Sequence, residues 1–144
     1  MTRPVRQLLA IVLAVLIAGA AYYGSYLPLR KSRLFISALN SMGSVRSFDE
    51  FERIFEPALN APGPVGQEEL VRNLGNVVLN IVRSSQDRPE VIERVISFLN
   101  GHFDPILARG KGMSFGQNIY ILGAINEIAF INTKQAAYLE ASKR

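Results

Sequence analysis

Residues 7–29 constrain the fold most, because these 23 consecutive positions carry no formal charge. A helix of about 20 apolar residues crosses a hydrocarbon core roughly 30 Å thick. Tyr22, Tyr23 and Tyr26 lie near the C-terminal end of the run, where amphipathic rings suit the headgroup region. Basic residues flank both ends of the run: Arg3, Arg6, Arg30, Lys31 and Arg33. The pattern predicts a basic N-terminus and a transmembrane helix over residues 1–29, with residues 30–144 tethered at a cell membrane.

Two other interpretations fit parts of the same stretch. A cleaved signal peptide also has a basic start, a short apolar run and a small-residue cleavage site, for which Ala18-Gly19-Ala20 would serve. However, the uncharged run continues past Ala20 to Leu29. The remaining interpretation is a buried helix of a soluble core. We favour the retained span over both.

Small residues follow one face of this stretch at helical spacing. Such residues let two helices approach closely in lipid, where packing drives association. The face therefore suggests a transmembrane partner helix, although alanine is common in membrane helices in any case. Its members are Ala10, Ala14, Ala18, Ala21 and Ser25.

Charge and residue types exclude several classes of function. All 12 acidic residues and 14 of the 16 basic residues follow Leu29, which leaves that part at a net charge of +2. This balance argues against a nucleic-acid partner. The similar positive charge on both flanks of the run leaves the membrane orientation open. The absence of cysteine excludes disulfides, thiolate metal sites and a cysteine nucleophile.

The rest of the chain reads as a series of helices, so we predict the all-α class. Capping-box patterns begin two of them, at Ser47 with Glu50 and at Ser114 with Gln117. Gly43 and Asn100-Gly101 are expected C-caps, Ala61–Pro64 is an expected turn, and Pro57 should kink or shorten its helix. The expected helices cover about 28–42, 47–59, 66–83, 89–100, 114–131 and a segment from 133.

These helices pair into antiparallel hairpins, which suggests a divergent tetratricopeptide-like array. Phe35, Ala38, Leu39 and Met42 match the first part of that repeat's spacing. Phe51, Phe55 and Ala58 match the second part, although Phe51 is larger than the usual residue. Phe55 and Leu74 are predicted core residues. The segment 133–144 ends without a cap or polar tail, so we expect a loosely packed end and a chain truncated at its C-terminus.

The order of the segments resembles the C-terminal part of bacterial O-antigen ligase/polymerase-family membrane proteins. An aromatic helix end, Tyr22 to Tyr26, is followed by the basic segment Leu29 to Leu34. Phe48 to Leu59, Tyr120 to Gly123 and Tyr138 to Glu140 complete the resemblance. It implies a last membrane helix with a tetratricopeptide-like tail. The catalytic loops of such glycan-transferring proteins would lie outside this chain, so no catalytic residue carries over.

Candidate chemical groups are few, and each has a simpler role. His102 could be a general base, but a surface or capping histidine is the better interpretation. Gly110-Lys111-Gly112 beside Arg109 could hold a phosphate, yet it lacks the Walker spacing. The pairs Glu68-Glu69 and Glu90/Glu93 are interpreted as first-turn charges that complement helix dipoles. We predict no catalytic, cofactor or metal site.

The leading hypothesis is a membrane-anchored helical-repeat module that binds a protein or peptide. The alternative is a C-terminal fragment of a glycan-transferring O-antigen ligase-like membrane protein whose catalytic helices are absent from this chain. A secreted helical protein, released by cleavage after Ala20, is the third possibility.

Overall fold

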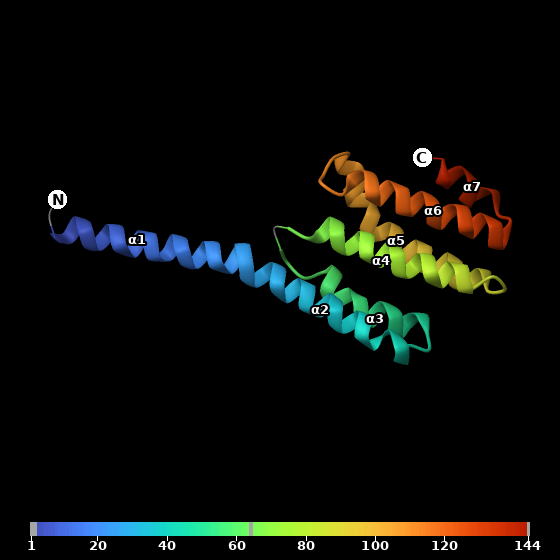
Figure 1. Ribbon diagram of the computed structural model, residues 1–144, viewed down its shortest axis with the longest axis horizontal. Helices are drawn as coiled ribbons and strands as arrows, with labels where there is room; N and C mark the ends of the chain where they lie inside the picture. Colours follow the sequence, from blue (N-terminus) through green and yellow to red (C-terminus); the bar gives the residue numbers. More distant parts are fainter. Residues whose placement is uncertain (1–2, 64, 144) are drawn as a thin grey trace.

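The computed structural model describes residues 3–63 and 65–143, and confirms the all-α class for them (Figure 1). Positions 1, 2, 64 and 144 lie outside this part, among them Pro64 of the predicted turn. The elements in chain order are α1 (Arg3–Ala21), the π-helix η1 (Tyr22–Tyr26), α2 (Leu27–Ser41), the 3₁₀ turn η2 (Met42–Ser44), α3 (Phe48–Leu59), α4 (Gln67–Ser84), α5 (Pro89–Arg109), α6 (Phe115–Thr133) and α7 (Ala136–Ser142).

The apolar N-terminal run and the first helix of the domain form one continuous helix, from Arg3 to Ser44. As expected, Pro28 lies in the first turn of α2, which begins at Leu27, but no break in the helical backbone separates α2 from the apolar run. Pro28 lacks an N–H for the carbonyl of Gly24, four residues earlier, and its ring would press on that carbonyl. The π turn η1 lies at this point, with the N–H of Leu27 donating to Tyr22, five residues back. The wider turn accommodates proline without ending the helix.

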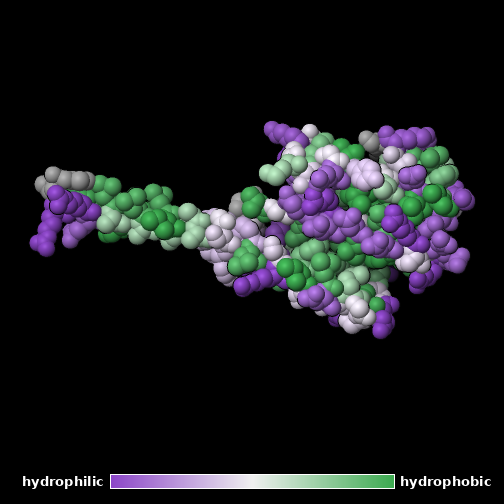
Figure 2. Space-filling model, viewed as in Figure 1, coloured by the Kyte–Doolittle hydropathy of each residue, from purple (hydrophilic) through white to green (hydrophobic). Residues whose placement is uncertain are grey.

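The α1 segment projects from the other helices and packs against none of them over its apolar length (Figures 1 and 2). None of its residues is buried, and Ile17, Val15 and Leu8 are 64–69% exposed. Within the described residues this is the one helix long and apolar enough to span a membrane. The small residues of the proposed helix-partner face are exposed too: Ala10, Ala14, Ala18, Ala21 and Ser25.

The other helices fold into three antiparallel pairs, α2–α3, α4–α5 and α6–α7 (Figure 1). The closest packing between pairs joins α4 to α6, while α3 lies against α5. Both predicted core residues, Phe55 and Leu74, are fully buried, which confirms them. Gly75 lies at the α4–α6 crossing, where a Cβ would meet Ile121 at 3.2 Å. Hairpin order is thus observed, whereas a regular tetratricopeptide-like array stays a prediction.

The N-terminal cap of α3 follows the predicted capping box in one of its two bonds, since the Glu50 carboxylate binds the N–H of Arg46 instead of that of Ser47. The Glu50 N–H donates to Ser47 Oγ at 3.2 Å, and the Glu50 carboxylate accepts from the Arg46 N–H at 2.7 Å. The helix ends at Leu59, two residues after Pro57. On the neighbouring α5, the Arg94 guanidinium pairs with Asp49 at 2.7 Å and lies 4.4 Å above the Phe48 ring, which holds α5 against the start of α3.

Three predicted helix ends were wrong. Gly43 lies inside η2 rather than capping α2. The helix α5 continues through Asn100-Gly101 and Asp104-Pro105 to Arg109, where Gly110 caps it in the left-handed region at φ 64°. The third end is at α6, which extends to Thr133 and is capped by Lys134 at φ 58°. Consequently α7 begins at Ala136 rather than near Thr133.

Candidate functional site

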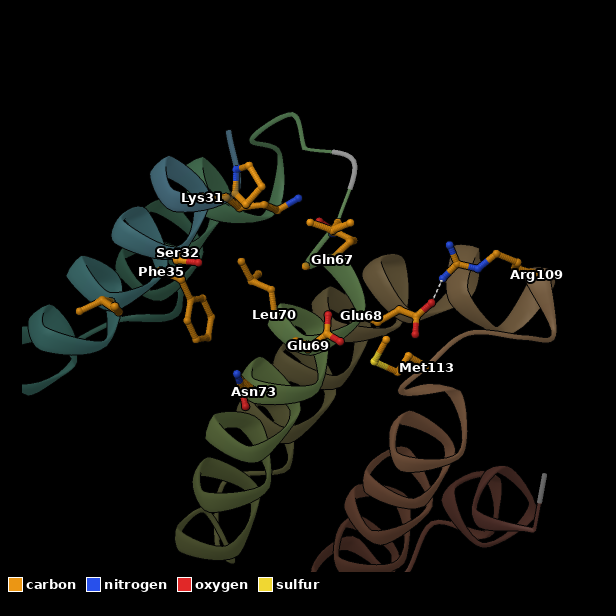
Figure 3. Close-up of a pocket in the computed structure, with 14 residues that line it drawn as sticks. Lys31, Ser32, Phe35, Gln67, Glu68, Glu69, Leu70, Asn73, Arg109 and Met113 are labelled. Carbon is orange, nitrogen blue, oxygen red and sulfur yellow. Dashed lines mark hydrogen bonds and ion pairs between the residues drawn. The ribbon is translucent and has the colours of Figure 1, made fainter. Parts of the chain in front are cut away.

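A groove of about 710 Å³ lies between α2 and the first half of α4, at the end of the domain from which α1 extends (Figure 3). It opens there because α2 packs on α3 while α4 packs on α5 and α6, so the two groove walls belong to different hairpins. The lining residues are Pro28, Lys31, Ser32, Phe35, Ile36, Val65, Gly66, Gln67, Glu68, Glu69, Leu70, Asn73, Arg109 and Met113.

Lys31 supplies the most unusual group on the α2 wall, a lysine with only 4% of its surface exposed. Its Nζ donates to the Ala61 carbonyl oxygen at 3.0 Å. In Figure 3 its side chain points from α2 toward the loop that leads into α4. Within the described residues no carboxylate forms an ion pair with it, and burial lowers the pKa of Lys31. An ammonium has three donors, so an anionic group in the groove would find unused hydrogen-bonding capacity here.

The opposite wall carries Glu68 and Glu69, in the first turn of α4 as predicted. Their role goes beyond the helix dipole. Glu68 forms an ion pair with Arg109 and accepts from the Ser114 N–H at 3.0 Å. Glu69 accepts from Ser114 Oγ at 3.2 Å. The two carboxylates therefore tie α4 to the loop between α5 and α6. The predicted capping box at Ser114 is absent, since no cap hydrogen bond joins its side chain to α6.

The Gly110-Lys111-Gly112 loop lies against the carboxylate of Glu68, an anionic group of the same chain. Gly112 adopts φ 148°, and a Cβ there would collide with the Glu68 carboxylate. Arg109 Nε donates to the Lys111 carbonyl at 3.1 Å, which closes the loop on itself. The loop thus holds Glu68 where we had considered a phosphate. All three residues of the loop are nevertheless exposed to solvent.

His102 lies in the interior of α5, and the prediction of a position at a helix end was wrong. Its ring packs edge-on against Phe98, with centroids 5.0 Å apart. Burial lowers the pKa of His102, and the nearby Glu56 partly offsets that effect. The folded chain therefore favours the neutral imidazole.

The structure places only one member of the remaining acidic pair, Glu90 and Glu93, in the first turn of its helix. Glu90 lies in the first turn of α5, as expected, but Glu93 lies beyond that turn. Together with burial, Glu93 raises the pKa of Tyr138 on α7, with burial the larger cause. Among the described residues, no three His, Asp or Glu side chains gather into a group that could hold a metal ion.

Sequence reasoning missed the groove and its lysine. Lys31 looked like one of the basic residues that flank the apolar run, among them the exposed Arg30 and Arg33. One signal was present, however. Lys31 precedes the buried residues Phe35 and Ala38 at helical spacing, which places it on the inward face of α2.

Comparison of the chain with protein-family models, with curated proteins and with solved structures found no match. The resemblance to O-antigen ligase/polymerase proteins therefore stays a prediction.

Proposed function

We propose that this chain is a membrane-anchored helical module that binds a segment of a partner protein in the groove between α2 and α4. The anchor is α1, whose exposed apolar surface suits a lipid environment. The groove with its buried Lys31, which pairs with no carboxylate among the described residues, is the observation that carries the binding proposal.

The chemistry of the groove indicates what the partner segment carries. Phe35 and Leu70 form an apolar floor, and Ile36 stands 55% exposed on the rim. Beside them, Lys31 offers a partly desolvated positive charge. Apolar surface with a few placed polar groups is typical of binding sites of this size. The segment that fits is apolar and bears a carboxylate for Lys31.

The position of the groove supports the helical-repeat interpretation. α2 and α4 are the first helices of consecutive hairpins, and arrays of hairpins present one extended concave binding surface. The groove lies between these two first helices. We further propose that the partner segment binds in this groove in the manner of a peptide in a tetratricopeptide array.

Site-specific photo-crosslinking in the native cells tests the proposal. Asn73 and Asn80 are both exposed on α4, but only Asn73 lines the groove. We expect a photoactivatable residue at position 73, and not at position 80, to give a discrete crosslinked product. Equal products from both positions, or none from position 73, would contradict the proposed binding groove.

A charge substitution sharpens this test. Lys31→Met should abolish the product at position 73, because it removes the groove cation while keeping an apolar stem. Arg53→Met is the matched control, since it removes an exposed charge from the neighbouring helix α3 outside the groove. Circular dichroism should show unchanged helix content in both variants. If the amount of crosslinked product is undiminished in Lys31→Met, Lys31 does not contribute to binding of the partner segment.

A further inference from the structure

Two loops lie at the end of the domain from which α1 extends (Figure 1). The loop between α3 and α4 is bound to the continuous helix by Lys31, which donates to Ala61, and the side chain of Lys31 also lies 3.6 Å from where a Cβ of Gly63 would be. The loop between α5 and α6 is bound to α4 through Glu68 and Ser114. A specific contact therefore joins the first loop to the continuous helix, while the second loop is held to α4.

Both loops present apolar side chains to the outside. Met113 is 97% exposed and Val65 is 59% exposed. Leu29, on the continuous helix between anchor and domain, is 50% exposed. Pro28, Val65 and Met113 border the same groove, so these apolar groups share one end of the molecule. Side chains of this kind gain free energy when they leave water.

The charged groups at this end are arranged with the cations outward. Arg30, Arg33 and Lys111 are exposed. The carboxylates of Glu68 and Glu69 are instead engaged with Arg109 and Ser114. Glu56 and Asp104 are also exposed, but they lie within the helices α3 and α5 and not in the two loops. Exposed basic residues beside a membrane helix are attracted to anionic lipid.

The distance between the apolar span and the loop held by Lys31 is short and fixed. No linker separates anchor from domain, because the helix is continuous from Arg3 to Ser44. Tyr26 and Lys31 are about 7.5 Å apart along the helix axis at roughly 1.5 Å per residue. The headgroup layer on each side of a bilayer is about 5–8 Å thick. With the tyrosines at the interface, the loop held by Lys31 lies at headgroup depth.

We propose that this end of the domain, formed by Leu29, Arg30, Arg33, Val65, Lys111 and Met113, docks on the surface of an anionic phospholipid bilayer. Val65 and Met113 enter the interface, while the basic side chains contact lipid phosphates. The proposal rests on the anchoring proposed above. Docking would fix the orientation of the domain on the leaflet, with one end of the α2–α4 groove next to the headgroups.

Lipid quenching of single labels in the full chain tests the docking. The chain has no cysteine, so Val65→Cys, Met113→Cys, Gln86→Cys and Ile17→Cys each give one site for an environment-sensitive fluorophore. The variants are reconstituted in vesicles of phosphatidylcholine with phosphatidylglycerol and a brominated lipid. Gln86 is the exposed control in the loop between α4 and α5, at the opposite end of α4, and Ile17 reports the anchor.

We expect the fluorescence emission of the labels at positions 65 and 113 to shift to shorter wavelengths. We also expect the brominated lipid to quench these two labels several-fold more than the label at position 86. Quenching should fall in phosphatidylcholine alone and at high salt, because screening weakens the basic contacts. If labels 65 and 113 behave like label 86 while label 17 is quenched, the docking surface is overturned and the anchor stands. If label 17 is not quenched, the anchoring itself is overturned.

Discussion

At the scale of single residues, Gly112 is expected to be sensitive to an added methyl group. Its φ of 148° is rarely adopted by residues with a Cβ, and the Glu68 carboxylate fills the space that a Cβ would need. Strained backbone of this kind costs about 1–3 kcal/mol. We expect Gly112→Ala to lower the free energy of unfolding by at least that amount in thermal denaturation followed by circular dichroism.

Gly116→Ala is the control for this substitution. Gly116 lies in the first turn of α6, and a Cβ there meets nothing within 4 Å. The control should be neutral or slightly stabilising, because alanine favours helix more than glycine does. Equal destabilisation by both variants would mean that contact with Glu68 does not restrict Gly112.

At the scale of elements, α5 shows how a strong local stop signal is overridden. Asn100-Gly101 is typical of a helix end, and Pro105 removes the hydrogen bond to the Gly101 carbonyl four residues back. The helix nevertheless continues, because Leu99, Phe103 and Ile106 keep helical spacing and are all buried.

This interpretation predicts opposite effects for two helix glycines. Gly101→Ala should stabilise the fold by about 0.5–1 kcal/mol, since its Cβ would meet nothing and helix propensity improves. Gly75→Val should destabilise it by about 1–3 kcal/mol, because side-chain atoms would be forced against Ile121. Chemical denaturation of both variants measures the two effects. A marked loss of stability in Gly101→Ala would instead support the helix end that the sequence suggested.

At the scale of the whole molecule, stability is expected to be uneven. The helix α4 contributes seven buried residues, whereas α7 contributes none. From α7, the partly buried Tyr138 packs against the core. Segments with few buried contacts open at low free energy. Amides of residues 136–141 should therefore exchange with solvent faster than those of residues 70–78 in native-state hydrogen exchange. Equal protection would show that α7 and α4 open together.

Local patterns in the sequence were sufficient for the class and the main elements. Helical spacing, the Ser47 cap and the uncharged run predicted an all-α chain with one apolar helix able to span a membrane, and these predictions agree with the structure. They succeeded because helix periodicity, capping and hydropathy depend on residues within about four positions of one another. The predicted helix end at Gly101 was wrong because burial of the following residues outweighed the local signal. The predicted end at Gly43 was wrong because a 3₁₀ turn follows α2 there.

The candidate site was decided by tertiary structure. Lys31 is buried because its ammonium reaches the Ala61 carbonyl, 30 positions away, and Glu68 is engaged by Ser114, 46 positions away. The groove exists because α2 and α4 pack on different neighbours. Such contacts depend on how whole helices cross, which no short pattern encodes. The sequence by itself determined which segments are helical and which one suits a membrane, whereas packing between distant helices decided where a charge is buried and a groove opens.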